Sequence, residues 1–292
     1  MIKIEGICSG WLDGSVEAIE DTPLCYLFKK YNSDKKFGGP RGSNHNYSNF
    51  YFEILKRFID DNRVINYFEL GLGSKNEEFI GGSPDGAVGG SLFAINDLLN
   101  PSIKEQKYKH GNIYGADIDG TIKIEHPNIK TFQCDQTCLK SINSLWDNKE
   151  LKDIEFDLII EDGLHELAAN IHFATHSLHK LKPGGIFIVE DCVCSASVLG
   201  MYTRPIGSGQ TYGYVIDESH KPFFPGKRDD GFRISANTLK PGKKEKIMFS
   251  INHLGVYHQY PTNKEFSEQH DLRINTVIKT YQSPIWVMQR NY

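Results

Sequence analysis

The chain lacks any apolar run of membrane-spanning length, since no segment approaches the ~20 apolar residues that a transmembrane helix needs. Its first residues also lack the apolar core of a signal peptide. A formal net charge of −4 over 292 residues, with no basic stripe interleaved with aromatic residues, gives no reason to expect nucleic acid as a partner. We therefore expect a cytoplasmic protein that binds neither membranes nor nucleic acids.

Cysteine is scarce and poorly spaced for a structural role. Six cysteines in a chain of this size do not suggest a disulfide framework, and the paired CxxC spacing of a structural zinc site is missing. We expect reduced thiols. Hydrophobic and charged contents of 39% and 24% are those of an ordinary globular protein.

The most informative stretch runs from residue 156 to residue 191. Residues 156–160 and 185–189 are short apolar runs that suit strands buried on both faces, as in a parallel sheet. A Lys-Pro-Gly-Gly turn at 182–185 is expected to stop the helix between them. That helix is predicted from one apolar stripe: Leu167, Ile171, Ala174, Leu178 and Leu181.

Acidic residues stand where both strands end. Asp162 follows the first, and Glu190 and Asp191 follow the second. A strand–helix–strand crossover makes the strands parallel, so their carboxyl ends meet at the edge where open α/β sheets bind ligands. Like charges so close are costly unless a cation or proton intervenes, and a hard divalent cation prefers oxygen ligands. The sequence predicts a metal site, with an ordinary solvated acidic loop end as the alternative. His165 can face the same point.

An acid and a glycine turn end an earlier strand, at 64–70. Glu69 precedes Gly71 and Gly73, which allow a tight turn and a close approach of a ligand to the backbone. The dinucleotide fingerprint wants a third glycine where this chain has Asn76. A Gly-rich insertion follows, and Ser91 is expected to cap the next helix.

The next strands also end in polar residues. Asp117 ends a strand at 112–119, and a carboxylate there can accept both hydroxyls of a ribose; Asp119 is the alternative. Asp135 and Gln136 close a strand at 129–134. The helix expected between these two strands has the weakest pattern.

The whole order of elements predicts an α/β fold, with a doubly wound, mostly parallel seven-stranded sheet completed by strand-like runs near the carboxyl end. We expect residues 1–60 to form an amino-terminal helical arm or cap packed on a domain spanning 61–292. A long stretch rich in Gly, Pro and aromatic residues, at 195–235, is expected to be a substrate lid, because long loops are uncommon unless functional. The strand-like runs are 246–251, 276–280 and 286–288.

Several motifs in this order resemble those of class I S-adenosylmethionine-dependent methyltransferases. The chain is most similar to the metal-dependent sugar O-methyltransferases of the mycinamicin type, although Leu164 replaces the usual serine of one motif. The matching stretches are Ser33-Asp34-Lys35, residues 45–53, Gly89-Gly90-Ser91-Leu92, Glu161-Asp162-Gly163-Leu164-His165 and residues 182–191.

The resemblance implies a Mg²⁺-dependent O-methyltransferase that uses S-adenosylmethionine and acts on a hydroxyl of a sugar, glycan or natural-product precursor. It implies that Asp162, Glu190 and Asp191 hold Mg²⁺ and that His165 is the general base. It further implies cofactor contacts from the methionine end to adenine: Glu69, Gly71, Gly73, Ser91, Asp117, Asp135, Gln136 and, from the arm, Tyr47.

Two other functions compete with this one. A nicotinamide-dependent oxidoreductase also has a Gly-x-Gly turn after a strand, and a non-catalytic partner subunit could retain the cofactor fold. A phosphorylated or nucleotide-linked acceptor stays open, and the sheet edges and the arm offer surfaces for a homo-oligomer. His172, His176 and His179 are expected to be partly exposed helix residues rather than metal ligands. If Asp162 lay far from Glu190 and Asp191, or if a lysine or arginine neutralised these acids, the proposed metal chemistry would fail and only the fold assignment would stand.

Overall fold

The computed structural model describes residues 22–36, 47–61, 63–76, 87–101, 111–165, 167–192, 260–279 and 284–292. It also describes four two-residue strands: β6 (Pro205–Ile206), β7 (Gln210–Thr211), β8 (Val215–Ile216) and β9 (Pro222–Phe223). The predicted lid at 195–235, apart from these strands, and the run at 246–251 lie outside the described residues. Within the described part, no helix is both long and apolar enough to cross a membrane.

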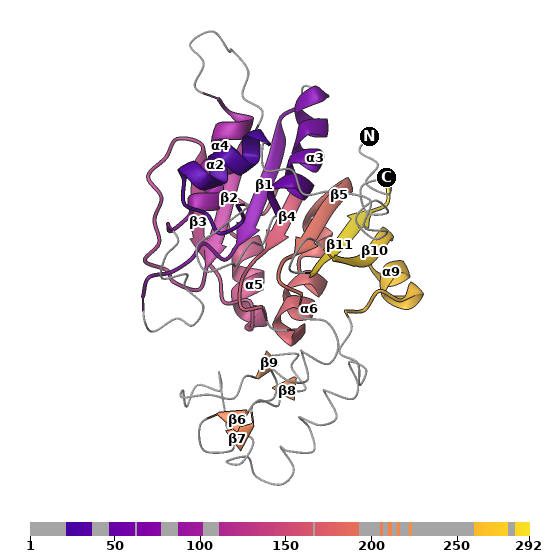
Figure 1. Cartoon of the computed structure of the whole chain (residues 1–292). Helices are drawn as coiled ribbons and strands as arrows, with labels where there is room; N and C mark the ends of the chain where they lie inside the picture. Colours follow the sequence, from indigo (N-terminus) through magenta and orange to yellow (C-terminus); the bar gives the residue numbers. More distant parts are fainter. Residues whose placement is uncertain are drawn as a thin grey trace.

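A seven-stranded sheet of order β10-β11-β5-β4-β1-β2-β3 forms the centre of the molecule (Figure 1). Strands β3, β2, β1, β4 and β5 run parallel to one another, whereas β11 is antiparallel to both β5 and β10. The predicted doubly wound, mostly parallel sheet is confirmed. The bounds are β1 (Ile65–Leu70), β2 (Gly111–Asp117), β3 (Ile129–Gln133), β4 (Phe156–Glu161), β5 (Leu181–Val189), β10 (Leu272–Lys279) and β11 (Pro284–Arg290).

Helices cover both faces of the sheet, which gives two hydrophobic cores. Successive side chains of a strand point to opposite faces, so Ile285 and Val287 of β11 enter one core while Trp286 and Met288 enter the other. The first core contains side chains of α2 (Pro23–Lys30), α3 (Tyr47–Asp60) and α4 (Gly90–Leu99). The second contains side chains of α5 (Leu139–Trp146), α6 (Leu167–Thr175) and α9 (Lys264–Gln269).

The amino-terminal helices are anchored on the sheet by local sequence signals and by apolar burial. Thr22 caps α2 by accepting a hydrogen bond from the Cys25 backbone N–H at 3.1 Å, and Pro23 opens the helix. Phe28 of α2 and Phe50 of α3 are fully buried in the first core. Each such side chain contributes about 1.5–3 kcal/mol. These contacts hold α2 and α3 against the sheet, and Lys35, five residues after α2, reaches Asp162 at the carboxyl end of β4.

Three local predictions are wrong. The helix after β4 ends at Thr175, and a short 3₁₀ turn, η2 (Leu178–Lys180), follows it. The Lys-Pro-Gly-Gly turn therefore lies inside β5, where the β4–β5 register shifts and Gly184 takes a left-handed φ of 74°. Such an irregularity accommodates a proline that cannot donate to the sheet.

The other two errors concern helix starts and connections. No helix forms in the fully described segment 118–128 between β2 and β3, which is too short to hold a helix and both of its turns. Gly89 caps α4 with a left-handed φ of 68°, and Ser91 lies inside that helix. The Ser91 hydroxyl donates instead to Glu69 Oε1 at 2.7 Å. The side chain that was predicted to cap the helix is therefore bound to a buried carboxylate.

Candidate functional site

The strand-end acids lie together because hydrogen bonds continue the sheet beyond the strands. The Asp162 N–H donates to Leu70 O, and the Glu190 N–H donates to Glu161 O, both at 2.8 Å. The carboxyl ends of β1, β4 and β5 are therefore neighbours at one edge. Asp162, Glu190 and Asp191 share this edge, as the sequence predicted, but they divide into two groups.

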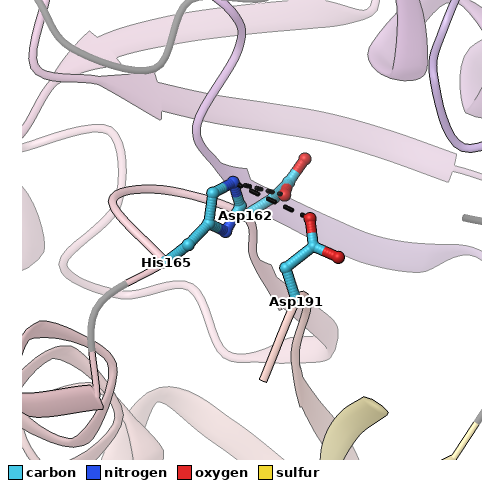
Figure 2. A group of neighbouring side chains, drawn as sticks. All are labelled: Asp162, His165 and Asp191. Carbon is cyan, nitrogen blue, oxygen red and sulfur yellow. Dashed lines mark ion pairs between the residues drawn. The ribbon is translucent and has the colours of Figure 1, made fainter. Parts of the chain in front are cut away.

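The outer group consists of Asp162, His165 and Asp191. Each offers one ligand atom, and these atoms lie within 4.8 Å of one another. Figure 2 shows the His165 ring turned toward both carboxylates, with Nε2 3.7 Å from Asp162 Oδ1 and 3.9 Å from Asp191 Oδ2. His165 and Asp191 have left-handed φ angles of 55° and 47°. Such backbone is costly for residues other than glycine and persists where surrounding structure imposes it, often at functional sites.

The inner group is built around Lys35, whose side chain is only 2% exposed. Its Nζ contacts Asp162 Oδ2 and lies 2.6 Å from Glu190 Oε2 and 3.5 Å from Glu69 Oε1. The other Glu190 oxygen accepts a hydrogen bond from the Tyr51 hydroxyl. Both oxygens of Glu190 are thus engaged by Lys35 and Tyr51.

Lys35 is the kind of cation that would count against a metal among these acids, but its single positive charge neutralises only part of their negative charge. Burial lowers the pKa of Lys35, but Asp162, Glu190 and Glu69 outweigh burial and hold that pKa well above its ordinary value. Burial and the neighbouring Asp162 raise the pKa of Glu190. The cluster therefore favours a further proton or cation despite the ammonium.

Helix α3 supplies two tyrosines that hold the acids after β5. Tyr47 and Tyr51 are one helical turn apart and share a face. The Tyr47 hydroxyl donates to Asp191 Oδ1 at 2.7 Å and accepts from the Asp191 N–H at 3.1 Å. Tyr47, expected as a cofactor contact, thus lies against an acid of the outer group.

The glycine turn after β1 packs directly against this edge. Gly71 and Gly73 have left-handed φ angles of 90° and 76°. A Cβ at Gly71 would come within 1.9 Å of Asp162 O, so only glycine allows β1 to pass so close to β4. A Cβ at Gly73 would meet no heavy atom within 4 Å, which leaves space for a ligand beside that backbone. Buried Glu69 accepts from the Tyr67 hydroxyl at 2.7 Å as well as from Ser91.

The remaining predicted residues fix neighbouring loops. Asp117 accepts from the Leu72 N–H at 2.7 Å and the Asp119 N–H at 2.9 Å. Asp119 accepts from the Ser74 hydroxyl at 2.6 Å. Asp135 accepts from the N–H and hydroxyl of Thr137. Gln136 donates to Glu161 Oε1 at 3.0 Å and accepts from the Leu164 N–H at 2.8 Å.

Sequence reasoning assigned no role to Lys35, Tyr51 or Glu161. Lys35 belongs to one of the matching motifs, and Tyr51 lies four residues after Tyr47. Neither observation indicated which residue the side chain would bind. His172, expected to be partly exposed, is 7% exposed and its Nδ1 lies 2.9 Å from Gln136 O. His176 follows the end of α6 at Thr175, and His179 lies in η2 rather than in that helix.

Comparisons with known proteins bear on the fold that carries this edge. No protein-family model matches the chain. It is 25% identical over 206 residues to the 8-demethyl-8-alpha-L-rhamnosyl tetracenomycin-C 2'-O-methyltransferase of Streptomyces olivaceus, a match covering 70% of this chain and 42% of that protein. The MycE methyltransferase of the mycinamycin biosynthetic pathway, solved with Mg and SAH, matches with a TM-score of 0.52 and 18% identity over 93% of this chain and 54% of MycE.

The chain has a methyltransferase fold. A second structure of MycE, with Mg, SAH and mycinamycin VI, matches with a TM-score of 0.51 and 18% identity over 93% of this chain and 55% of MycE. The resemblance to mycinamicin-type enzymes that the motifs indicated is confirmed at the level of fold. The chain spans about half the length of these relatives or less.

Proposed function

We propose that the chain transfers a methyl group from S-adenosylmethionine to a hydroxyl of a sugar-containing acceptor and requires Mg²⁺. The observation that carries this proposal is the convergence of Asp162, His165 and Asp191 beside the glycine turn of a methyltransferase fold. Further support comes from the relatives, since one is named as a rhamnosyl 2'-O-methyltransferase and the other was solved with Mg and SAH.

The outer group fits a hard divalent cation. Asp162 and Asp191 offer carboxylate oxygens, the ligands that Mg²⁺ prefers, and one oxygen of each lies within 4.8 Å of the other, a separation that two bonds of about 2.0–2.6 Å to one ion can span. Glu190 was predicted as a third ligand. It would instead support the site indirectly, because its carboxylate binds Lys35 and Tyr51. Because the two carboxylates suit the cation, the imidazole of His165 is left for proton transfer.

His165 would act as the base at this edge. A bound divalent cation lowers the pKa of an acceptor hydroxyl and so makes it a better nucleophile. The His165 Nε2 faces the same point as both carboxylates and can accept the hydroxyl proton. Asp162 and Asp191 flank the ring and would stabilise the imidazolium that results. The buried Nδ1 of His165 finds no hydrogen-bond partner among the described residues.

The cofactor would lie over the glycine turn. The open space at Gly73 suits a ligand that approaches the backbone, and Gly71 lets the turn meet Asp162. Glu69 and Ser91 would stand at the methionine end, Asp117 at the ribose, and Asp135 and Gln136 near adenine. Positioning of the two reactants would supply much of the acceleration, on a scale of effective molarities of about 10⁵ M and above.

The test is a transfer assay with labelled S-adenosylmethionine and a panel of rhamnosylated and other deoxysugar acceptors, with Mg²⁺ or with excess chelator. Transfer should require Mg²⁺. Asp162→Asn should lower turnover by about 10² or more, the cost of losing one electrostatic stabiliser, while product binding persists. Asp153→Asn changes an exposed aspartate shortly before β4 and is the matched control.

Each competing function predicts a different result. Full activity in chelator would remove the metal from the proposal. Cofactor binding without transfer to any acceptor would favour a partner subunit. Fluorescence titration with a reduced nicotinamide cofactor would reveal an oxidoreductase.

A further inference from the structure

Lys35 fills the inner side of the carboxylate cluster. Its ammonium has three N–H donors, and three carboxylates surround it: those of Asp162, Glu190 and Glu69. Glu69 and Glu190 are almost fully buried, and each accepts further hydrogen bonds from hydroxyl groups. The ammonium is therefore held on all sides by oxygen atoms that the fold itself has fixed.

Asp162 is shared between the inner and the outer group. Its Oδ2 contacts Lys35, whereas its Oδ1 lies 3.7 Å from His165 Nε2. Since the two oxygens belong to one planar carboxylate, the bond to Lys35 sets the direction in which Oδ1 points. Lys35 thus acts on the rest of the outer group through its contact with Asp162.

The charges of the cluster do not balance. Glu69, Asp162, Glu190 and Asp191 supply four carboxylates, and Lys35 supplies one ammonium. Without that ammonium the buried inner acids would be left unpaired, which is strongly unfavourable unless another cation replaces it. The oxygens around Nζ are hard donors, and a divalent ion with room to enter would be an adequate replacement.

We propose that Lys35 is a positioning residue of the metal-dependent reaction: its ammonium occupies the inner side of the cluster as a built-in cation and confines the divalent ion to the outer side, beside His165. This inference rests on the proposed function, because it concerns where that ion binds. It also gives the described residues directly after α2 a role at the site, since Lys35 binds Asp162 of the outer group.

Counting bound Mn²⁺ ions by electron paramagnetic resonance on the full chain tests this assignment. The unchanged protein should bind one ion. Lys35→Ala should bind two, because truncation empties the place of the ammonium and leaves its oxygen donors. Lys35→Ala/Glu190→Gln should bind one, because the inner side then loses the Glu190 carboxylate and keeps only Glu69 and the shared Asp162. Lys30→Ala, which removes a half-exposed lysine paired with Asp97, should bind one.

Each outcome separates this inference from the proposed function. One ion in both the unchanged protein and Lys35→Ala would overturn the inference and leave the proposed metal role standing. No ion in the unchanged protein but one in Lys35→Ala would overturn the positioning role of Lys35 and remove the metal from the proposed function, although it would show that the ammonium occupies a cation site. No ion in either would overturn both.

Stability gives a second measurement in case Lys35→Ala unfolds. The inference predicts that Mn²⁺ or Mg²⁺ restores the far-ultraviolet circular dichroism of that variant and raises its Tm by more degrees than it raises the Tm of the unchanged protein. A variant that stays unfolded at saturating Mn²⁺, while Lys35→Ala/Glu190→Gln folds without ions, would overturn it.

Discussion

The hydroxyl of Tyr47 and the residue Asp191 bind one another twice although they are 144 positions apart: the hydroxyl donates to Oδ1 at 2.7 Å and accepts from the backbone N–H at 3.1 Å. Asp191 has a left-handed φ of 47°, a conformation that costs of order 1–3 kcal/mol. The two bonds hold both its backbone and its side chain. Helix α3 therefore decides where Asp191 Oδ2 points, which is toward His165.

Tyr47→Phe removes both bonds and leaves the ring. We expect Mn²⁺ affinity to fall by about 10–100-fold, the usual cost of losing a hydrogen-bond partner behind a metal ligand. Turnover should fall with it and recover partly at high Mg²⁺. Titration with Mn²⁺ measures the effect, and Tyr26→Phe, on an exposed ring of α2, is the control. Equal affinities in the two variants would mean that Asp191 does not hold the ion.

Substitutions of the two glycines in the turn after β1 should have different effects on stability and on ligand binding. Gly71→Ala combines a left-handed residue, at about 1–2 kcal/mol, with a Cβ only 1.9 Å from Asp162 O, at about 1–3 kcal/mol for overpacking. We expect a loss of several kcal/mol in the free energy of unfolding. Gly73→Ala meets open space and should cost only the first amount, yet it should weaken the binding of S-adenosylhomocysteine.

Urea unfolding and calorimetric titration of both glycine variants would separate stability from ligand binding. If Gly73→Ala binds the product as tightly as the unchanged protein, the cofactor does not approach this backbone.

Local sequence patterns were enough to predict most of the sheet and its acidic edge. Apolar runs identified β1, β4 and β5, and the acids directly after them had to meet once the strands were parallel neighbours. What could not be predicted depends on contacts between distant residues. Lys35 reaches Asp162 across 127 positions, and no periodicity reports such a pairing. Likewise Ser91 has the residue type of a helix cap, but its hydroxyl binds the buried Glu69 of β1.

Asp117 and Asp119 compete for the role of ribose acceptor, and paired variants should decide between them. Burial raises the pKa of Asp117, whereas bonds from Ser74 and Thr121 lower that of Asp119. We expect Asp117→Asn to weaken S-adenosylhomocysteine binding by about 10–100-fold, equivalent to about 1.5–3 kcal/mol for a hydrogen bond to a charged group. Asp119→Asn should have a much smaller effect. Calorimetric titration measures both, and the reverse order would assign the ribose to Asp119.

Glu161 should make the stability of the protein fall as the pH rises. The residue is 1% exposed, one carboxylate oxygen finds no partner among the described residues, and burial raises its pKa from 4.5 to about 7. Between these two values the folded state holds a proton that the unfolded state has released. The contribution of Glu161 is therefore fully present below about pH 4.5 and is lost as the pH passes through about 7, up to about 3 kcal/mol in all.

Glu161→Gln keeps an acceptor for the N–H groups of Gln136 and Gly163 but cannot ionise. In urea unfolding with chelator present, the variant should gain stability relative to the unchanged protein as the pH is raised from 5 to 8. Glu155→Gln, on an exposed side chain before β4, should show no such trend. A difference between the unchanged protein and Glu161→Gln that stays constant from pH 5 to pH 8 would mean that Glu161 is already ionised at pH 5, and that a partner for its second oxygen stabilises the charge.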